Sequence, residues 1–427
     1  MKRSSAATVP ANVLSGSHGP VHATPFRHQS YTAAPPCTPH YFMRPRGGPR
    51  VGSVEFRRRM QEVGEALAGA HTGVINLVHS SFAALDSLSI LTALARRCRT
   101  ASGAIGRLAS QLIDAEAPDA GSYTPAFATA FEMGINSSAA PRTFEADSEA
   151  SIGRRAGYVD VRLASWSSEN HHLGRADAAI RMIDELAALP LDAGERVLFW
   201  GHGHAGNVFA LMSQLLSADA AALEQFFAAA SVYYRWPMAR LVDIPVWRRV
   251  RQLLVTERGR LNERPCDWVT FGTPLRYGWK LRPGDKLLHF IHHRPADNGP
   301  AHLARFPARM DDVLHGTGGD YLQQVAIAGT DTAPAPLVWR SWLANRRLGR
   351  LFEPHQEADE LSSRLETGAR VPDCGTTLLV DYGAEPGRPA EHLAGHAVYT
   401  RPEWLLFHAE RVVQHLYGGT TARSRAA

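Results

Sequence analysis

The sequence predicts an α/β fold in which a mostly parallel sheet is wound by helices on both of its faces. Short apolar runs alternate along the chain with longer segments that have a helical spacing of apolar residues, and this alternation is typical of β-α-β units. Several short runs are apolar throughout, as expected for strands that are buried on both faces. The sequence contains no internal repeat and no heptad pattern, so a doubly wound sheet is the predicted architecture.

The alternating pattern begins after a segment that lacks it. Residues 1–52 are basic and contain many Pro and Gly residues, so we expect them to be a disordered extension and residues 53–427 to form one domain. The domain starts with a predicted helix at 56–70, which is followed by the first predicted strand at 73–78. Two more helices are then expected at 82–98 and 102–117, and a polar loop or an excursion is expected at 118–155.

Strand-like runs recur through the rest of the chain, each bounded by Gly, Pro or polar residues. They lie at 158–166, 196–200, 267–274, 287–293, 323–330 and 376–383. Helical patterns follow at 174–189 and 208–216, and an amphipathic helix at 403–417 ends the domain. The segment 217–265 is helical and rich in aromatic and Arg residues, which suits a cap or lid excursion from the sheet.

The basic balance of the chain comes from its first residues. The formal net charge is +5 and the pI is about 9.1. Of the 46 Lys and Arg residues, six lie within residues 1–54, which contain no Asp or Glu, so the remainder holds 40 basic and 41 acidic residues. The chain after residue 54 therefore has almost no net charge, which gives no electrostatic reason to expect nucleic acid as a partner.

Cysteine spacing and hydropathy exclude several further classes of protein. The four cysteines are far apart in the sequence, at Cys37, Cys98, Cys266 and Cys374. This spacing excludes a zinc ribbon or a CxxC redox site and indicates a reduced, cytoplasmic setting. No apolar run approaches the ~20 residues of a transmembrane helix, and the N-terminus lacks the apolar core of a secretory signal.

The most informative motif is WGHGHAG at 200–206, where the strand RVLFW runs through a tight turn directly into a helix. Two small residues, Gly201 and Ala205, stand two positions on either side of a central residue, Gly203. A nucleophile elbow needs this spacing because its central residue has a strained backbone and larger flanking side chains would clash with the turn. A phosphate loop is the alternative, but the motif matches neither GxGxxG nor GxxxxGKS/T, so we expect no nucleotide or other cofactor.

On these residues the chain resembles the α/β-hydrolases of the lipase/esterase kind, over about residues 70–417. The resemblance implies an α/β-hydrolase fold with Gly203 at the nucleophile position, where the family has Ser, Cys or Asp. His202 matches the GHSxGG form that is frequent in lipases. No hydroxyl or thiol is present between residues 201 and 207, so the motif keeps the spacing of the elbow and lacks its attacking atom.

The resemblance also implies an oxyanion site next to the elbow. The backbone N–H groups of His204 and of Ser81 or Phe82 would hold the oxyanion. The family has a glycine before this second group, whereas this chain has Ser80. An N-cap of the following helix is an equal alternative for Ser80 and Ser81.

A base and an acid complete the site that the resemblance implies. The base is expected to be His396, on the loop between the last strand and the final helix, in preference to His392. Asp331 is the first choice for the acid that orients the imidazole, and Asp320 is the second. Asp297 becomes the candidate if the strand before it is the penultimate one.

A polar cluster, WSSENHH at 166–172, follows a strand end. Glu169, His171 and His172 have the residue types of a metal site. Adjacent histidines on a loop seldom bind one ion, however, and no third region has a matching spacing. We therefore expect no metal, and we interpret the cluster as a polar wall of the pocket and the start of a helix.

These observations support three hypotheses on function. The first is a catalytically impaired, lipase- or esterase-like pseudoenzyme that binds an ester or acyl ligand or a partner, because covalent acyl transfer has no attacking atom without the nucleophile. The second is an active carboxyl-ester hydrolase, in which His396 activates water directly, or in which Gly203 is a sequencing error or a recent mutation and Gly203→Ser restores ordinary serine esterase chemistry. The third is a protein-interaction module that uses the Arg- and Trp-rich stretch 233–251.

Overall fold

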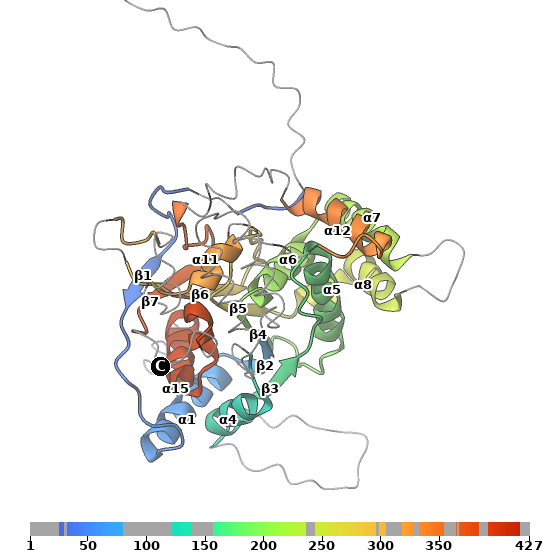
Figure 1. Cartoon of the computed structure of the whole chain (residues 1–427). Helices are drawn as coiled ribbons and strands as arrows, with labels where there is room; N and C mark the ends of the chain where they lie inside the picture. Colours follow the sequence, from blue (N-terminus) through green and yellow to red (C-terminus); the bar gives the residue numbers. More distant parts are fainter. Residues whose placement is uncertain are drawn as a thin grey trace, which may run out of the picture.

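A single open sheet of seven parallel strands forms the centre of the protein in the computed structural model (Figure 1). The residues described are 25–29, 32–79, 122–137, 157–235, 244–295, 299–304, 318–327, 329, 331, 333–353, 364, 367–383 and 392–418. The strand order is β1-β7-β6-β5-β4-β2-β3. The strands are β1 (His40–Met43), β2 (Thr72–Val78), β3 (Asp160–Ala164), β4 (Arg196–His202), β5 (Cys266–Phe271), β6 (Lys286–His292) and β7 (Thr376–Val380).

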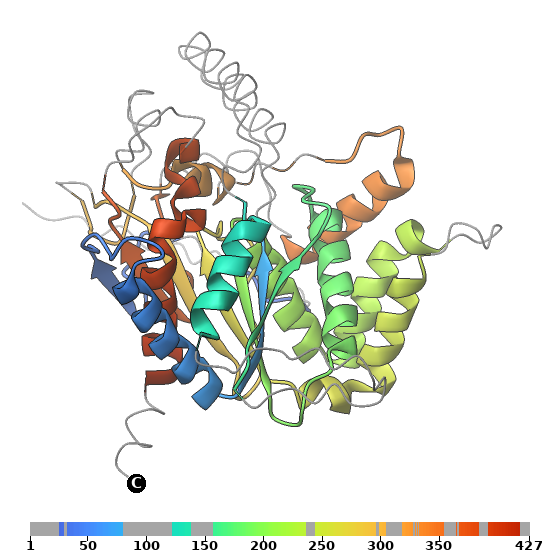
Figure 2. The same cartoon turned by 90° about the horizontal axis from the view of Figure 1, so that it is seen from below.

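Helices cover both faces of this sheet, as Figure 2 shows. One face packs against α1 (Val54–Gly69), α4 (Pro125–Ile135) and α15 (Pro402–Val412). The other face packs against α5 (His172–Ala188), α6 (Ala205–Ser217), α7 (Ala220–Tyr234), α8 (Pro245–Thr256), α9 (Arg258–Asn262) and α12 (Trp339–Phe352). The short helix α11 (Tyr321–Ile327) follows β6 along the chain. The described chain is therefore an α/β protein with two separate apolar cores.

The central strands are apolar throughout because each face of the sheet is buried. In β4, Leu198 and Trp200 contribute to the core under α1, α4 and α15. Val197 and Phe199, which alternate with them, contribute to the core under α5 and α6. This alternation of side chains between two buried faces is the pattern of a parallel sheet that is covered on both sides.

The strand order places a topological switch point between β2 and β4. The chain passes from β2 outward to the edge strand β3, returns to β4 on the other side of β2, and then continues through β5, β6 and β7 in the opposite direction. Ligands of open α/β sheets bind at such a point, outside the carboxyl ends of the strands. The bend that was predicted at 200–206 follows β4 and therefore lies at this position.

Most strand predictions are confirmed, and three expectations are wrong. The run at 323–330 begins as the helix α11, because the Asp320 carboxylate accepts the Gln323 N–H and caps it. A short apolar run cannot by itself distinguish a buried strand from a buried helix. The expected loop at 118–155 contains α4, and the expected disordered extension contains β1, which pairs with β7. The helices expected at 82–98 and 102–117 lie outside the described residues.

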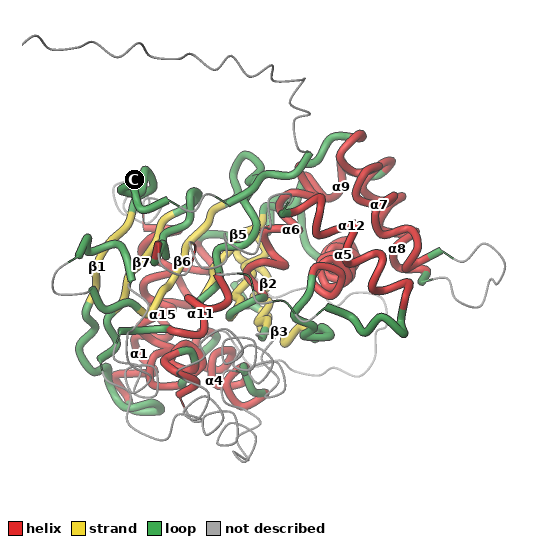
Figure 3. The backbone as a smooth tube through the Cα atoms, turned by 45° about the horizontal axis from the view of Figure 1, so that its top comes forward, coloured by secondary structure: helices red, strands yellow, loops and turns green. Residues whose placement is uncertain are grey.

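The helices of the expected cap segment, 217–265, extend one helical layer of the fold. α7 packs against α12 and α8, while α8 also packs against α5, and α9 contacts α5 and α6. Figure 3 shows these helices on the side of the molecule away from α1 and α15. The segment is thus tied to the same apolar core as α5 and α6.

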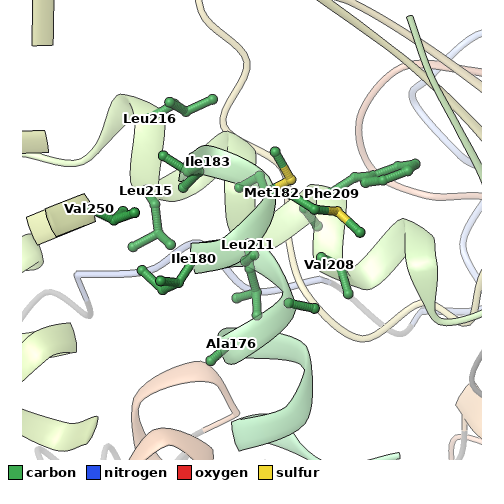
Figure 4. Close-up of a cluster of buried hydrophobic side chains, with 14 of the residues drawn as sticks. Ala176, Ile180, Met182, Ile183, Val208, Phe209, Leu211, Leu215, Leu216 and Val250 are labelled. Atoms are coloured by element: carbon green, nitrogen blue, oxygen red, sulfur yellow. The ribbon is translucent and has the colours of Figure 1, made fainter. Parts of the chain in front are cut away.

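The contact between α5 and α6 carries much of this core, as Figure 4 illustrates. Leu211 on α6 is fully buried between these helices. We expect Leu211→Ala to lower the free energy of unfolding by about 2–5 kcal/mol, because the truncation leaves a cavity. Urea unfolding measures this change. Met133→Ala, at an exposed position of α4, is the control and should change stability by less than about 0.5 kcal/mol.

Because several histidines are buried, we expect the protein to lose stability in mild acid. Burial lowers the pKa of His408 to about 3 and that of His289 to about 4. The unfolded chain, with a histidine pKa of about 6.5, binds these protons first, so the stability that is present above pH 6.5 is lost as the pH falls toward 4. Urea unfolding between pH 7 and 4 should show this decline.

His408→Gln separates the contribution of one histidine from that of the others. The variant loses the contact of His408 Nε2 with the Tyr382 hydroxyl, at 2.8 Å, and should be less stable at pH 7. The difference in the free energy of unfolding between the unchanged protein and the variant should decrease by up to about 1.4 kcal/mol per pH unit below 6.5. A gap that stays constant across this range would contradict the prediction.

Candidate functional site

The sequence WGHGHAG forms a sharp bend between β4 and α6. Gly203 stands between the end of the strand at His202 and the start of the helix at Ala205, and its φ is +55°. A positive φ of this size favours glycine over other residues. The Gly203 N–H donates to the carbonyl of Phe271 at 2.8 Å, which fixes the bend to the end of β5.

Close packing explains why small residues flank the bend. A Cβ on Gly201 would lie 2.4 Å from Cε2 of Phe209 and 3.1 Å from the Cβ of Ala205. A Cβ on Gly206 would lie 2.1 Å from the Thr273 hydroxyl oxygen. These separations are far below van der Waals contact, so the strand, the helix and the β5 loop approach closely only because these side chains are missing.

A buried histidine–aspartate pair lies beside this bend. His396 Nδ1 is 2.7 Å from Asp320 Oδ2, and both side chains are fully buried. The Tyr399 hydroxyl donates to the same oxygen at 3.1 Å, while the Gln323 N–H donates to Oδ1 at 2.9 Å. An ionised carboxylate only accepts hydrogen bonds, so Nδ1 of His396 carries a proton, and in the neutral form of the ring Nε2 is the basic nitrogen.

Asp320 stays ionised although it is buried. Burial by itself would raise the pKa of this carboxyl, but the His396 imidazole, the Gln323 N–H and the charge of Arg370 together hold its pKa below the usual range. Hydrogen bonds and a nearby cation both stabilise the charged form. The site therefore combines a carboxylate and an imidazole in the arrangement that orients a general base.

Asp331, the first choice for the acid, is paired with arginines and not with His396 in this structure. Both oxygens of Asp331 accept from Arg175 at 3.0 Å, and Arg276 donates to the same carboxylate at 3.1 and 3.4 Å. Asp320, the second choice, contacts His396 instead. Asp297, the remaining alternative, lies outside the described residues.

The histidine is also held against the bend itself. The rings of His202 and His396 are stacked with centroids 4.3 Å apart, and Nε2 of His202 is 3.0 Å from the carbonyl oxygen of His396. Two segments that are 194 residues apart in the sequence thus meet at this contact. The bend after β4 and the loop before α15 are parts of one site.

A chain of hydrogen bonds links the bend to Asp320. The Thr273 hydroxyl donates to the carbonyl of Gly203 at 2.8 Å. The carbonyl of Thr273 accepts from the Gln323 side-chain amide at 3.0 Å, and the backbone N–H of Gln323 in turn binds Asp320. Displacement of any one segment would therefore disturb the others.

His292, at the end of β6, is a residue that the sequence analysis missed. Its N–H donates to the Tyr399 hydroxyl at 2.6 Å, and its ring Nδ1 lies 3.2 Å from the carbonyl of Gly395. Its carbonyl accepts both the Asp320 N–H at 3.0 Å and the guanidinium of Arg370 at 2.6 Å. His292 thus positions both loops of the pair, although nothing in its local sequence distinguishes it from the other histidines.

A second buried polar cluster lies on the other side of the bend. Arg175 and Arg276 are fully buried and converge on Asp331, and Arg276 also binds Glu353 at 2.6 and 2.9 Å. Burial alone would raise the pKa of Asp331, but the two guanidinium groups hold it well below its usual range. The cluster is therefore an ion-pair network, with two cations and two carboxylates.

The predicted polar segment 166–172 contributes to this network. It leads into α5, whose N-cap is His171. Nη1 of Arg175 donates to Asn170 at 3.0 Å and lies 3.5 Å from Nδ1 of His204. Burial and the charge of Arg175 lower the pKa of His204 well below its usual value, so this histidine is neutral.

The described residues include no group of three or more His, Cys, Asp or Glu side chains that could hold a metal ion.

Only one side of the expected oxyanion site can be located. His204 follows Gly203 directly and is the N-cap of α6. Ser81 and Phe82 lie outside the described residues. The strand before them, β2, pairs with β4 so that Val78 is opposite Gly201, and the carboxyl end of β2 is thus next to the bend.

The chain matches no protein-family model, no curated protein and no solved structure at the required significance. Among the helices that are described, none combines the length and the apolar character that crossing a membrane requires. The fold class and the geometry of the site therefore carry the functional argument.

The charge state of Asp320 can be tested by a neutral variant. Because the folded-state pKa of Asp320 is lowered, its contribution to stability is present above the unfolded pKa of about 3.9 and is lost as the pH falls below that value. We expect Asp320→Asn to reduce the free energy of unfolding by about 1.5–3 kcal/mol at pH 7 and by a smaller amount at pH 3, where the carboxyl of the unfolded chain is largely protonated. Urea unfolding at both pH values measures this.

Asp192→Asn is the matched control, since Asp192 is exposed. It should change stability by less than about 0.5 kcal/mol at either pH. If Asp320→Asn had the same effect at pH 7 and pH 3, the carboxylate would not be charged in the folded protein.

Proposed function

We propose that this chain is an α/β-hydrolase-fold protein of lipase/esterase ancestry that has kept its base and acid and lost its nucleophile. In this proposal it binds an ester or acyl ligand, and it does not form an acyl-enzyme. The observation that carries the proposal is the buried His396–Asp320 pair, which lies against a strand–helix bend whose central residue, Gly203, has no side chain.

The order of the parts along the chain supports this ancestry. In α/β-hydrolases the nucleophile elbow comes first, the acid second and the histidine last. Here the bend follows β4, Asp320 follows β6, and His396 follows β7. All three positions are thus at the carboxyl edge of one parallel sheet, where ligands of such sheets bind.

The chemistry of the described site supports loss of covalent catalysis. The hydroxyl of Thr273 is near the bend, but it donates to the backbone carbonyl of Gly203. The hydroxyl of Tyr399 donates to Asp320. Each hydroxyl thus has a structural partner, and no residue of the bend itself carries a hydroxyl or thiol. An acyl group has no attacking atom at the position where the family places one.

Direct activation of water is the second candidate function. The Nδ1 proton of His396 is held by Asp320, which leaves Nε2 basic. In this reaction Nε2 takes a proton from water, the water oxygen attacks the ester carbonyl, and the imidazolium returns the proton to the leaving alkoxide. Slow ester hydrolysis that disappears in His396→Gln would favour this activity over ligand binding alone.

Restoring the nucleophile tests the main proposal. A fluorophosphonate probe, which labels activated serines, should not label the unchanged protein. Gly203→Ser should be labelled and should hydrolyse short p-nitrophenyl esters, because the serine would stand beside the base. The positive φ of residue 203 should reduce the stability of this variant by about 1–3 kcal/mol, which thermal unfolding measures.

Two controls separate restored catalysis from nonspecific labelling. Gly203→Ala has a similar backbone strain and no hydroxyl, so it should remain unlabelled. The double variant Gly203→Ser/His396→Gln should lose most of the labelling, since the base is missing. Labelling of the unchanged protein, or a folded Gly203→Ser protein that stays unlabelled, would refute the proposal.

A further inference from the structure

Three consecutive large apolar side chains are exposed at the start of α12. Leu337 is 95% exposed, Val338 is 55% exposed and Trp339 is 52% exposed. Single apolar residues on a surface are ordinary, but a contiguous group of large ones marks an interaction site. Figure 2 shows the start of α12 at the outer margin of the molecule, beyond α5. We call residues 337–339 the apolar tip.

The apolar tip is fixed to the body of the protein. The helix that follows it buries Ala344, Leu348 and Phe352 in the core it shares with α5 and α7. Arg340 donates to the carbonyls of Val232 and Tyr233, at the end of α7, at 2.7 and 3.1 Å. These contacts anchor the helix directly behind the tip, so the exposure of the tip is a feature of the folded chain.

The helix that begins at the apolar tip is positively charged. The helix α12 has the sequence WRSWLANRRLGRLF, which contains four arginines and no acidic residue. Arg346, Arg347 and Arg350 are exposed, and the guanidinium of Arg346 lies 5.1 Å from the ring centroid of Trp342. Apolar side chains, tryptophan and arginine on one helix are the composition of a segment that lies at a membrane surface.

We propose that the start of α12 docks this protein on an anionic lipid surface, where Leu337 and Trp339 enter the headgroup region and the arginines contact lipid phosphates. Three side chains are too few for a stable protein interface, which buries about 1,200–2,000 Å² in total. A small apolar tip with cations further along the same helix is sufficient for weak, reversible membrane binding. This inference goes beyond the proposed function, since it does not involve the bend or the His396–Asp320 pair.

Vesicle binding tests the proposal with the full chain. The protein is sedimented with vesicles of phosphatidylcholine alone and of phosphatidylcholine mixed with phosphatidylglycerol. We expect binding to the anionic vesicles that weakens at high salt and is weaker still for the neutral ones. Leu337→Asp should reduce the affinity about tenfold or more, and Arg346→Glu and Arg347→Glu should each reduce it about fivefold or more.

Matched variants show whether the position of the change matters. Val54→Asp places the same charge at another exposed apolar site, and Arg57→Glu reverses a charge on α1, on the opposite face of the sheet. Both should bind as the unchanged protein does. The proposal is overturned if the unchanged protein binds neither vesicle type, or if Leu337→Asp binds like Val54→Asp. Self-association that depends on Leu337, without vesicle binding, would identify a protein contact and would equally overturn it.

Discussion

The hydrogen bond between Asp320 and His396 fixes the loop after β6 to the loop after β7. A carboxylate in the protein interior is costly unless hydrogen bonds and opposite charge compensate for lost water. Here the compensation comes from four groups on three stretches of the chain: the imidazole of His396 and the hydroxyl of Tyr399, the N–H of Gln323, and the charge of Arg370. The loops after β6 and β7 must therefore adopt one arrangement relative to each other.

The same constraint accounts for glycines near the pair. A Cβ on Gly272 would lie 2.5 Å from the Tyr399 ring and 2.6 Å from the Asp320 carboxylate. A Cβ on Gly395 would lie 2.3 Å from the carbonyl oxygen of Gly319. The backbone approaches the buried pair so closely that side chains are excluded there. Gly203 differs from these glycines, because in the proposed ancestry position 203 carried the side chain that reacted with the substrate.

The bend is thus supported from both sides by polar networks of different kinds. On one side, Asp320 holds Nδ1 of the His396 ring at 2.7 Å. On the other, Asp331 neutralises buried arginines, and Arg175 reaches His204 directly after the bend. If the apolar tip contacts lipid, only the five residues 332–336 separate it from Asp331 along the chain, so the two are at most about 20 Å apart.

The sequence by itself determined the α/β class, most of the strands and the bend around Gly203, because apolar periodicity and small-residue spacing act over a few neighbouring residues. It also placed His396 on the loop between the last strand and the final helix, where the structure has it. Only the tertiary structure decided that Asp320 rather than Asp331 meets this histidine, and that His292 holds both loops. The partners in the pair are 76 residues apart. Which buried polar groups satisfy one another depends on how distant segments pack, and no local pattern encodes that choice.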